Sequence, residues 1–244
     1  MLTIVGIGPG KAEGMTMETY ECLSRCECIV GYTVYVDLVR QLFPDKVYYS
    51  TPMTQEVERC QWAIEQAASG REVAMVCSGD SGVYGMAGLV CELAGEETGV
   101  EVLPGVTAAC SGAALLGAPL AHDFAVISLS DRLTPWDKIE KRLQAAAAGD
   151  FVICLYNPAS KGRPDYLRKA CDILCETGVE EERICGVVQN IGREGESSRI
   201  MTLAALRDYA ADMFTTVYIG NRMTKQLGER MITPRGYRQV NGEV

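Results

Sequence analysis

Three glycine-rich segments carry residue types that commonly meet a small ligand. The first, GIGPG (6–10), follows an apolar run at the start of the chain. A dinucleotide fingerprint, G-x-G-x-x-G, needs its third glycine at position 11, where this chain has Lys11, and Pro9 removes a backbone N–H that would face a pyrophosphate. A Walker A loop fails too, because Ala12 stands in place of Ser or Thr. The segment is therefore glycine-rich for a reason other than nucleotide binding.

The other two segments are SGDSGVYG (78–85) and PGVTAACSG (104–112), and each also follows a predicted strand. In a parallel sheet, the segments that follow strands meet at the carboxyl edge, where ligands bind. Asp80 lies among the glycines of the second segment. From the residues alone, its carboxylate is equally suited to capping the following helix and to accepting a hydrogen bond from a ligand.

The charge of the chain narrows the class of ligand. A net charge of −9 over 244 residues and an isoelectric point near 4.8 argue against broad binding to nucleic acid or to an anionic membrane. An anionic substrate would need a local group of cations. Six cations are expected in loops: Lys11, Arg132, Lys161, Arg163, Arg193 and Arg235. Each alone is better explained as a solvated residue, but together they favour an anionic ligand.

The 11 cysteines lack the C-x-x-C spacing of a zinc or iron–sulfur site, so no metal is expected. Cys22 and Cys26 are four residues apart, as are Cys171 and Cys175, which suits the buried faces of helices. No cleavable apolar leader follows Met1. The chain is therefore expected in the reducing cytoplasm.

One long uncharged stretch resembles a membrane span in length. It runs from Val102 to Ala121, which is 20 residues. Pro104, Pro119 and three glycines interrupt it, and much of the rest is alanine. A buried helix of small residues between two halves of the protein explains it better.

Hydrophobic patterning predicts two halves of alternating strands and helices, joined near residue 118. In the first half, strands are expected at 2–8, 28–32, 46–50, 71–80 and 100–106, and helices from Thr16 to about Cys26, from Thr54 to Ser69, and around Val83, Met86, Val90 and Leu93. In the second half, strands are expected at 124–130, 151–156, 184–190 and 215–221, and helices from Thr134-Pro135-Trp136 onward, near 164–176 and near 202–212.

Six motifs, taken in order, resemble those of one enzyme family. They are GIGPG, SGD-x-GVYG, LPGVTA, LYNP (155–158), QNIGREGE (189–196) and TPRGY (233–237). Over essentially its whole length the chain resembles the tetrapyrrole methyltransferases of cobalamin and siroheme synthesis. The stretch GAPLAHDFAVISLSDRLTPW (117–136) is similar to the members that methylate C17 of precorrin-3B or, in the anaerobic route, of cobalt-factor III. Ser81 departs from the family, which commonly has proline there, and is expected to loosen the turn.

The resemblance implies a fold, a cofactor and a set of contacts. The fold would be the non-Rossmann class III α/β methyltransferase, with a parallel sheet in residues 1–117, a mixed sheet in 118–244 and an active-site trough between these domains. S-adenosylmethionine would be the methyl donor, S-adenosylhomocysteine the product, and the protein a homodimer. Donor contacts carried over by position are Pro9, Gly79, Asp80, Val83, Tyr84, Thr107, Ala108, Tyr156, Asn157, Asn190 and Ile191. The anionic tetrapyrrole would meet Gly8, Gly10 and the six loop cations.

Methylation at C17 in this family accompanies ring contraction, in which a lactone forms from a side-chain carboxylate. That step needs a proton donor or acceptor. His122 is the only histidine; it is a candidate for this role, with a structural role as the alternative. Asp123 would orient it, and Ser128, Ser130 and Asp131 are alternatives.

Several other functions stay open at this level. A relative of the same fold could methylate another ring carbon, a protein or ribosomal RNA, although the acidic charge disfavours RNA. A nucleotide-dependent oxidoreductase is disfavoured because the chain lacks the dinucleotide-binding fingerprint. A non-catalytic tetrapyrrole carrier would have no use for the SGDSGVYG segment. The presence of cobalt in the substrate also stays open, with the many thiols favouring the anaerobic route.

Overall fold

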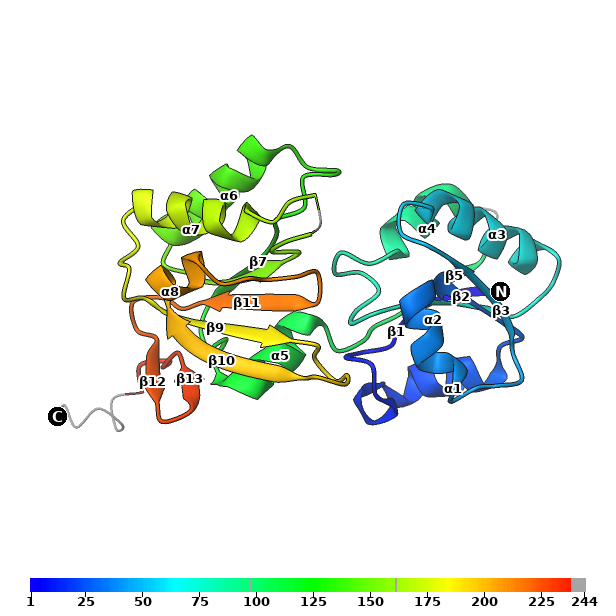
Figure 1. Cartoon of the computed structure of the whole chain (residues 1–244). Coiled ribbons are helices and arrows are strands. Elements are labelled where there is room, and N and C mark those ends of the chain that lie inside the picture. The colour runs from blue at the N-terminus through cyan, green and yellow to red at the C-terminus, as the bar shows by residue number, and fades with distance from the viewer. Residues whose placement is uncertain (97, 161, 238–244) are drawn as a thin grey trace. The chain divides into compact units, whose positions relative to one another are not determined.

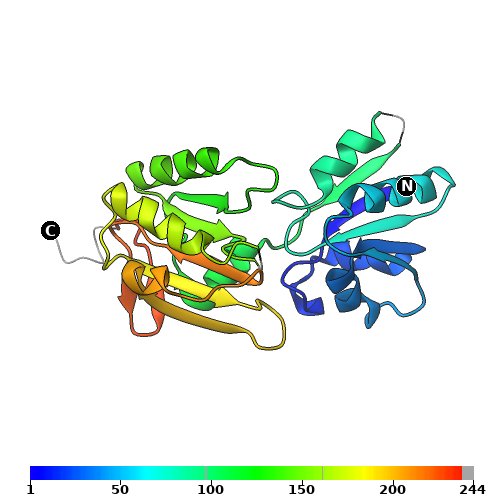
Figure 2. The same ribbon diagram turned by 45° about the horizontal axis from the view of Figure 1, so that its top comes forward.

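The computed structural model describes residues 1–96, 98–160 and 162–237. Contacts between Cα atoms divide the chain into two compact units, Met1–Ser111 and Gly112–Val244. The division falls inside the helix α5 (Ala108–Leu116), earlier than the expected boundary after Gly117. Each unit contains its own sheet with helices packed on it (Figures 1 and 2).

The first unit is a five-stranded parallel sheet with helices on both faces. Its elements are β1 (Leu2–Gly6), the 3-10 helix η1 (Ala12–Gly14), α1 (Met17–Arg25), β2 (Cys28–Tyr32), α2 (Thr33–Arg40), β3 (Val47–Thr51), α3 (Glu56–Ala68), β4 (Val73–Cys77), α4 (Ala87–Ala94) and β5 (Val100–Leu103). The strand order is β3-β2-β4-β1-β5, and every neighbouring pair is parallel. The five expected strands are confirmed, whereas α2 was not expected.

Strand β1 shows why the central strands of this sheet are largely apolar. Val5 packs in a cluster with α1 and α2, while Leu2 and Ile4 pack in a second cluster with α3 and α4. Successive side chains of a strand point to opposite faces, so a strand covered on both faces needs apolar residues at every position. Figure 1 shows the two pairs of helices on opposite faces of this sheet.

The ends of two helices test the expected boundaries. The Thr16 side chain accepts a hydrogen bond from the Thr19 N–H (3.1 Å) and caps α1, as expected. Helix α4 begins at Ala87, so Val83 lies outside the helix in which its spacing had placed it. Residues 81–86 form a run of bends instead, with Tyr84 in the left-handed region at φ +53°.

The second unit holds a mixed sheet and a small three-stranded sheet. Its elements after α5 are β6 (Gly117–Ala118), β7 (Phe124–Ser128), α6 (Trp136–Ala148), β8 (Val152–Tyr156), α7 (Tyr166–Glu176), β9 (Ile184–Gln189), β10 (Ser197–Thr202), α8 (Leu203–Arg207), β11 (Thr215–Ile219), β12 (Lys225–Leu227) and β13 (Arg230–Ile232). The mixed sheet has the order β10-β9-β11-β8-β7, and the small sheet β12-β13-β6. Only β7 and β8 pair in parallel in the mixed sheet.

Several elements of this unit differ from expectation. β10 was missed because its residues, SSRIMT, are exposed or half-buried and lack an apolar run. The strands of the small sheet are two or three residues long, too short for a periodic signal. Helix α8 spans five residues, less than the expected 202–212. Pro135, which the sequence predicts at the first helical position, occupies the N-cap of α6.

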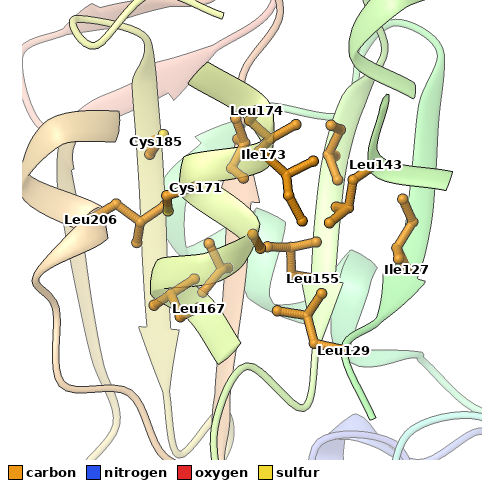
Figure 3. Close-up of a cluster of buried hydrophobic side chains, with 14 of the residues drawn as sticks. Ile127, Leu129, Leu143, Leu155, Leu167, Cys171, Ile173, Leu174, Cys185 and Leu206 are labelled. Carbon is orange, nitrogen blue, oxygen red and sulfur yellow. The ribbon is translucent and has the colours of Figure 1, made fainter. Parts of the chain in front are cut away.

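The core of the second unit lies between its sheet and the helices α6, α7 and α8. Leu143, Leu174 and Leu206, one from each helix, are fully buried in one cluster with residues of β7, β8, β9 and β11 (Figure 3). Cys171 and Cys185 are fully buried in the same cluster. The expected burial of thiols is confirmed for Cys171, and in the first unit for Cys22 and Cys26, whereas Cys175 is half-buried.

The uncharged stretch forms a short helix with one buried face. Helix α5 has nine residues; Ala109 and Leu116 are buried, while Cys110 and Leu115 are exposed. The expected buried helix is therefore buried on one face and exposed on the other. Across the described part of the chain, no helix combines the length and apolar character needed to cross a membrane.

Candidate active site

The three glycine-rich segments of the first unit meet at one edge of its sheet. They follow β4, β1 and β5, which are neighbours in the strand order. Gly8 and Gly79 exchange two backbone hydrogen bonds, from the Gly8 N–H to the Gly79 carbonyl (3.0 Å) and from the Gly79 N–H to the Gly8 carbonyl (2.8 Å). The first segment is thus paired with the second at the carboxyl edge.

Glycine is required here because backbone packs directly on backbone. A Cβ atom on Gly105 would lie 2.2 Å from the Gly79 carbonyl oxygen and 2.6 Å from the Gly6 carbonyl carbon. A Cβ on Gly6 would in turn lie 2.6 Å from the Gly105 nitrogen. All three segments are therefore held at separations that no side chain would permit.

Asp80 joins the second and third segments. Its Oδ1 accepts hydrogen bonds from the N–H groups of Gly82 (2.8 Å) and Val83 (2.9 Å), and its Oδ2 accepts one from Gly105 N–H (3.0 Å). The helix-cap interpretation is wrong, since α4 begins at Ala87 and its N-cap makes no side-chain hydrogen bond. The carboxylate organises the loops on which the predicted donor contacts lie.

Ser81 gives the same loop a second anchor. Its buried hydroxyl donates a hydrogen bond of 2.8 Å to the Leu103 carbonyl at the end of β5. The expectation that serine only loosens the turn overlooked this bond, which a proline at this position could not make.

The remaining predicted contacts of the first unit lie beside these loops. An ideal Cβ on Gly79 would be 3.4 Å from the Ala108 nitrogen and 3.5 Å from Thr107 Cα, so Gly79 packs on the start of α5. Tyr84 is 54% exposed and Val83 is 37% exposed. Pro9 and Gly10 are half-buried, while Gly8 is buried.

In the second unit, the predicted donor contacts also share one edge. The strands β7, β8 and β9 run in one direction, because β9 and β8 are each antiparallel to β11 and β7 is parallel to β8. Their carboxyl ends carry Ser128, Tyr156 and Asn157, and Asn190 and Ile191, respectively. Asn157 Nδ2 donates to Ser128 Oγ (2.9 Å), and the Tyr156 carbonyl accepts from Leu129 N–H (2.9 Å).

The backbone is left-handed at three of the predicted donor contacts. Tyr84, Asn157 and Asn190 each have φ +53°. Apart from glycine, the described residues contain only two further positions with positive φ, at Thr54 and Asp150. Asparagine adopts this conformation at little cost, whereas at Tyr84 it costs of order 1–3 kcal/mol, and such strain concentrates at functional sites. This independent geometric signal therefore coincides with the residues identified by motif.

The predicted catalytic residues are not brought together. His122 and Asp123 precede β7, whereas Ser128 ends it. At about 3.3 Å per residue, six residues separate His122 from Ser128 by roughly 20 Å. His122 Nδ1 accepts a hydrogen bond from Asp123 N–H (2.8 Å), and the Asp123 carboxylate oxygen Oδ2 lies 3.6 Å from the same nitrogen. Asp123 lies beside His122, as expected of a residue that orients it, while the alternative Ser128 lies at the other end of β7 with the predicted donor contact Asn157.

The predicted substrate cations have different surroundings. Lys11, Arg132 and Arg235 are exposed. The Arg193 guanidinium carbon lies 5.6 Å from the centre of the Phe214 ring, and Arg163 forms an ion pair with Asp131 through Nε. Lys161 lies outside the described residues.

Asp131 has a second partner that the motifs did not suggest. The Tyr166 hydroxyl donates to Asp131 Oδ2 at 2.5 Å. This hydrogen bond, together with the neighbouring Arg163 guanidinium, holds the pKa of Asp131 below its usual value. Asp131 is therefore a carboxylate and a poor proton donor. Tyr166 was missed because a tyrosine at the start of a helix has no distinctive sequence signal.

The buried thiols have the character of unreactive groups, whereas Cys91 and Cys110 are exposed. Burial raises the pKa of Cys26 and of Cys171 to about 12 and that of Cys77 to about 11. Within the described residues, no group of three or more His, Cys, Asp or Glu side chains is arranged to hold a metal ion.

Comparison with known proteins identifies the class. The family model described as Tetrapyrrole (Corrin/Porphyrin) Methylases matches residues 1–207. The chain belongs to this family of methyltransferases.

Individual relatives are similar over nearly the full length. A probable cobalt-factor III C(17)-methyltransferase of Salmonella typhimurium is 48% identical, over 97% of this chain and 99% of its own. A precorrin-3B C(17)-methyltransferase of a Sinorhizobium species is 41% identical, over 97% of this chain and 96% of its own.

Solved structures agree with the fold. The crystal structure of the methyltransferase CobJ has a TM-score of 0.88 and 37% identity, covering 96% of this chain and 99% of that one. A uroporphyrin-III C-methyl transferase from Thermus thermophilus, complexed with S-adenyl homocysteine, has a TM-score of 0.68 and 22% identity, covering 90% of this chain and 96% of that one. The expected non-Rossmann α/β methyltransferase fold, with a parallel and a mixed sheet, is confirmed.

Proposed function

We propose that the protein transfers the methyl group of S-adenosylmethionine to C17 of cobalt-factor III or precorrin-3B, with contraction of the ring, in cobalamin biosynthesis. The observation that carries the proposal is the left-handed backbone at Tyr84, Asn157 and Asn190, which lie in the motifs shared with this family. The names of the Salmonella and Sinorhizobium relatives support the position of the methyl group.

The residues present fit S-adenosylmethionine as the donor. Backbone amides and carbonyls dominate the glycine-rich edge, and they suit a ligand with a nucleoside and an amino-acid end. When bound, the donor supplies an electrophilic methyl group on sulfur. The role of the chain is to hold and orient the reactants, and such positioning is worth up to ~7–11 kcal/mol of the barrier.

Ser128 is the proposed proton-handling residue of the ring contraction. Its hydroxyl lies beside Asn157, one of the proposed donor contacts, and accepts the Asn157 side-chain N–H. The same oxygen also accepts the Ser130 N–H (3.3 Å), so the Ser128 hydroxyl is held in place at the edge that carries the proposed donor contacts. His122 has no comparable neighbour among these contacts.

Cobalt-factor III is the preferred substrate of the two. The relative named for it is 48% identical, against 41% for the relative named for precorrin-3B. The free thiols of all 11 cysteines are also more easily kept where oxygen is scarce.

Two further properties belong to this proposal. The free thiols favour a reducing compartment, and we propose the cytoplasm. We also propose a homodimer, by analogy with the family. Light scattering on a size-exclusion column would return twice the 26.5 kDa chain mass for a homodimer, and the chain mass itself would reject it.

The activity is tested by anaerobic incubation with S-adenosylmethionine and, in parallel, cobalt-factor III or precorrin-3B. Mass spectrometry of the extracted pigment should show one added methyl group, with an equal amount of adenosylhomocysteine released. Pigment that binds but is unchanged, in protein that binds no adenosylhomocysteine, would indicate a carrier. Failure to bind either pigment would reject the proposed function.

A further inference from the structure

A charged cluster joins two loops at the carboxyl edge of the mixed sheet. Asp131 lies in the loop after β7, and Arg163 in the loop after β8. The two side chains form an ion pair through Arg163 Nε and Asp131 Oδ1, with each only about 30% exposed (30% and 28%). Because β7 and β8 are parallel neighbours, this pair lies at the same edge as Ser128 and Asn157.

Tyr166, the first residue of α7, holds this pair in place. Its hydroxyl donates to Asp131 Oδ2 (2.5 Å), and its ring lies 5.9 Å from the Arg163 guanidinium carbon. The ring itself packs on Trp136, with 4.5 Å between ring centres. The Asp131 carboxylate is therefore fixed from a rigid helix start, and it fixes Arg163 in turn.

The ion pair leaves the guanidinium able to bind another carboxylate. Asp131 is met by Nε, the donor nearest the main chain, whereas the two Nη groups carry four of the five donors of an arginine. No other carboxylate of the described residues lies within 4.0 Å of Arg163. Because Asp131 already holds the guanidinium, the Arg163 side chain loses little conformational entropy when its two Nη groups bind a carboxylate.

The loop that carries Asp131 also offers an apolar contact. Leu133 is 98% exposed, next to the exposed Arg132. A bare leucine beside cations is complementary to a flat, largely apolar ring whose rim carries carboxylates.

We propose that Asp131 and Tyr166 are positioning residues that hold the Arg163 guanidinium for a peripheral carboxylate of the tetrapyrrole substrate. This inference rests on the proposed function and deepens it. It assigns Arg163 to the substrate, and it predicts that the other two residues act only through Arg163.

The test is a double-mutant cycle on full-length protein, using Tyr166→Phe, Arg163→Met and the combined variant. Tyr166→Phe keeps the ring against Trp136 and removes only the hydroxyl. The matched control is Asp208→Asn, which breaks the exposed Arg168–Asp208 ion pair (2.6 Å) in the same unit. Three quantities are measured for each variant. They are the dissociation constant of cobalt-factor III, by absorbance titration, that of adenosylhomocysteine, by calorimetry, and the melting temperature.

Arg163→Met should weaken cobalt-factor III binding roughly tenfold to hundredfold, and Tyr166→Phe roughly two- to tenfold. In the combined variant, loss of the Tyr166 hydroxyl should add nothing to the effect of Arg163→Met. Adenosylhomocysteine binding should stay within about twofold throughout, as should all binding by Asp208→Asn.

Three results would overturn the inference. Fully additive losses would show that Tyr166 acts independently of Arg163, and equal losses for both ligands would show a general structural role. Unchanged pigment binding in Arg163→Met would remove the substrate contact while leaving the proposed function intact. If wild-type protein binds no pigment at all, both the inference and the proposed function fail.

Discussion

Replacing Gly105 with alanine tests the claim that backbone packing builds the glycine-rich edge. The new Cβ would lie 2.2 Å from the Gly79 carbonyl oxygen and 2.6 Å from the Gly6 carbonyl carbon, and neither neighbour is a movable side chain. The two segments must separate by about 1 Å, which costs about 1–3 kcal/mol as overpacking. The same shift strains the bond between Gly105 N–H and Asp80 Oδ2, and a hydrogen bond to a charged group is worth about 1.5–3 kcal/mol.

Together these effects should lower the free energy of unfolding of the first unit by about 3–5 kcal/mol, a large share of a typical ~5–15 kcal/mol. The chain has two tryptophans, Trp62 and Trp136. In a Trp136→Phe background, fluorescence during urea denaturation therefore reports on the first unit alone, through Trp62. Calorimetry measures adenosylhomocysteine affinity, which should fall more than tenfold.

The matched control is Gly88→Ala. Gly88 lies in α4, and its added Cβ would meet nothing within 4 Å. Alanine should stabilise the helix by about 0.5–1 kcal/mol and leave ligand affinity unchanged. If Gly105→Ala proves as stable as Gly88→Ala and binds adenosylhomocysteine as tightly, the packing argument is refuted.

Three smaller predictions follow from single contacts. Ser81→Ala should lower the free energy of unfolding, measured by urea denaturation, by about 1–2 kcal/mol because the buried Leu103 carbonyl loses the hydrogen bond from the Ser81 hydroxyl. In the control Ser24→Ala, the lost hydroxyl bonds the exposed Tyr20 carbonyl, and the loss should be under about 0.5 kcal/mol. Equal losses in the two variants would contradict the prediction. Thr16→Ala should cost about 1 kcal/mol by removing the cap of α1, and no loss of stability would dismiss that cap. Cys26 and Cys171, with pKa values raised to about 12, should resist iodoacetamide at pH 8, while the exposed Cys91 and Cys110 react. Unfolding releases thiols of ordinary pKa near 9, so the free energy of unfolding should fall between pH 9 and 12. A free energy of unfolding that stays constant over this pH range would reject the raised pKa values.

The sequence predicted the buried strands well for a physical reason. A strand covered on both faces, such as β4 with its residues VAMVC, is apolar at every position and therefore visible in composition alone. Strands with exposed faces give no such signal, and β10 with its residues SSRIMT was missed. The helix α4 begins later than predicted because Val83 has helical spacing but lies in a bend, where its N–H donates to Asp80.

For the site, motifs located the segments but not the side-chain partners. The strand order, which sequence spacing does not encode, brings GIGPG, SGDSGVYG and PGVTA to one edge. The sequence does not distinguish between a helix cap and a ligand contact for Asp80, whereas the structure shows that its carboxylate accepts three backbone N–H groups. His122 and Ser128 are close in sequence, but an intervening strand places them at opposite edges of a sheet.

The central claim is methyl transfer to C17, and the most direct test is the location of the transferred carbon. The protein is incubated anaerobically with cobalt-factor III and S-adenosylmethionine labelled with carbon-13 in the methyl group, and the pigment is analysed by nuclear magnetic resonance. We expect one labelled methyl group, bonded to C17 of a contracted ring. A label at any other ring carbon, or no label in pigment that remains bound, would contradict it.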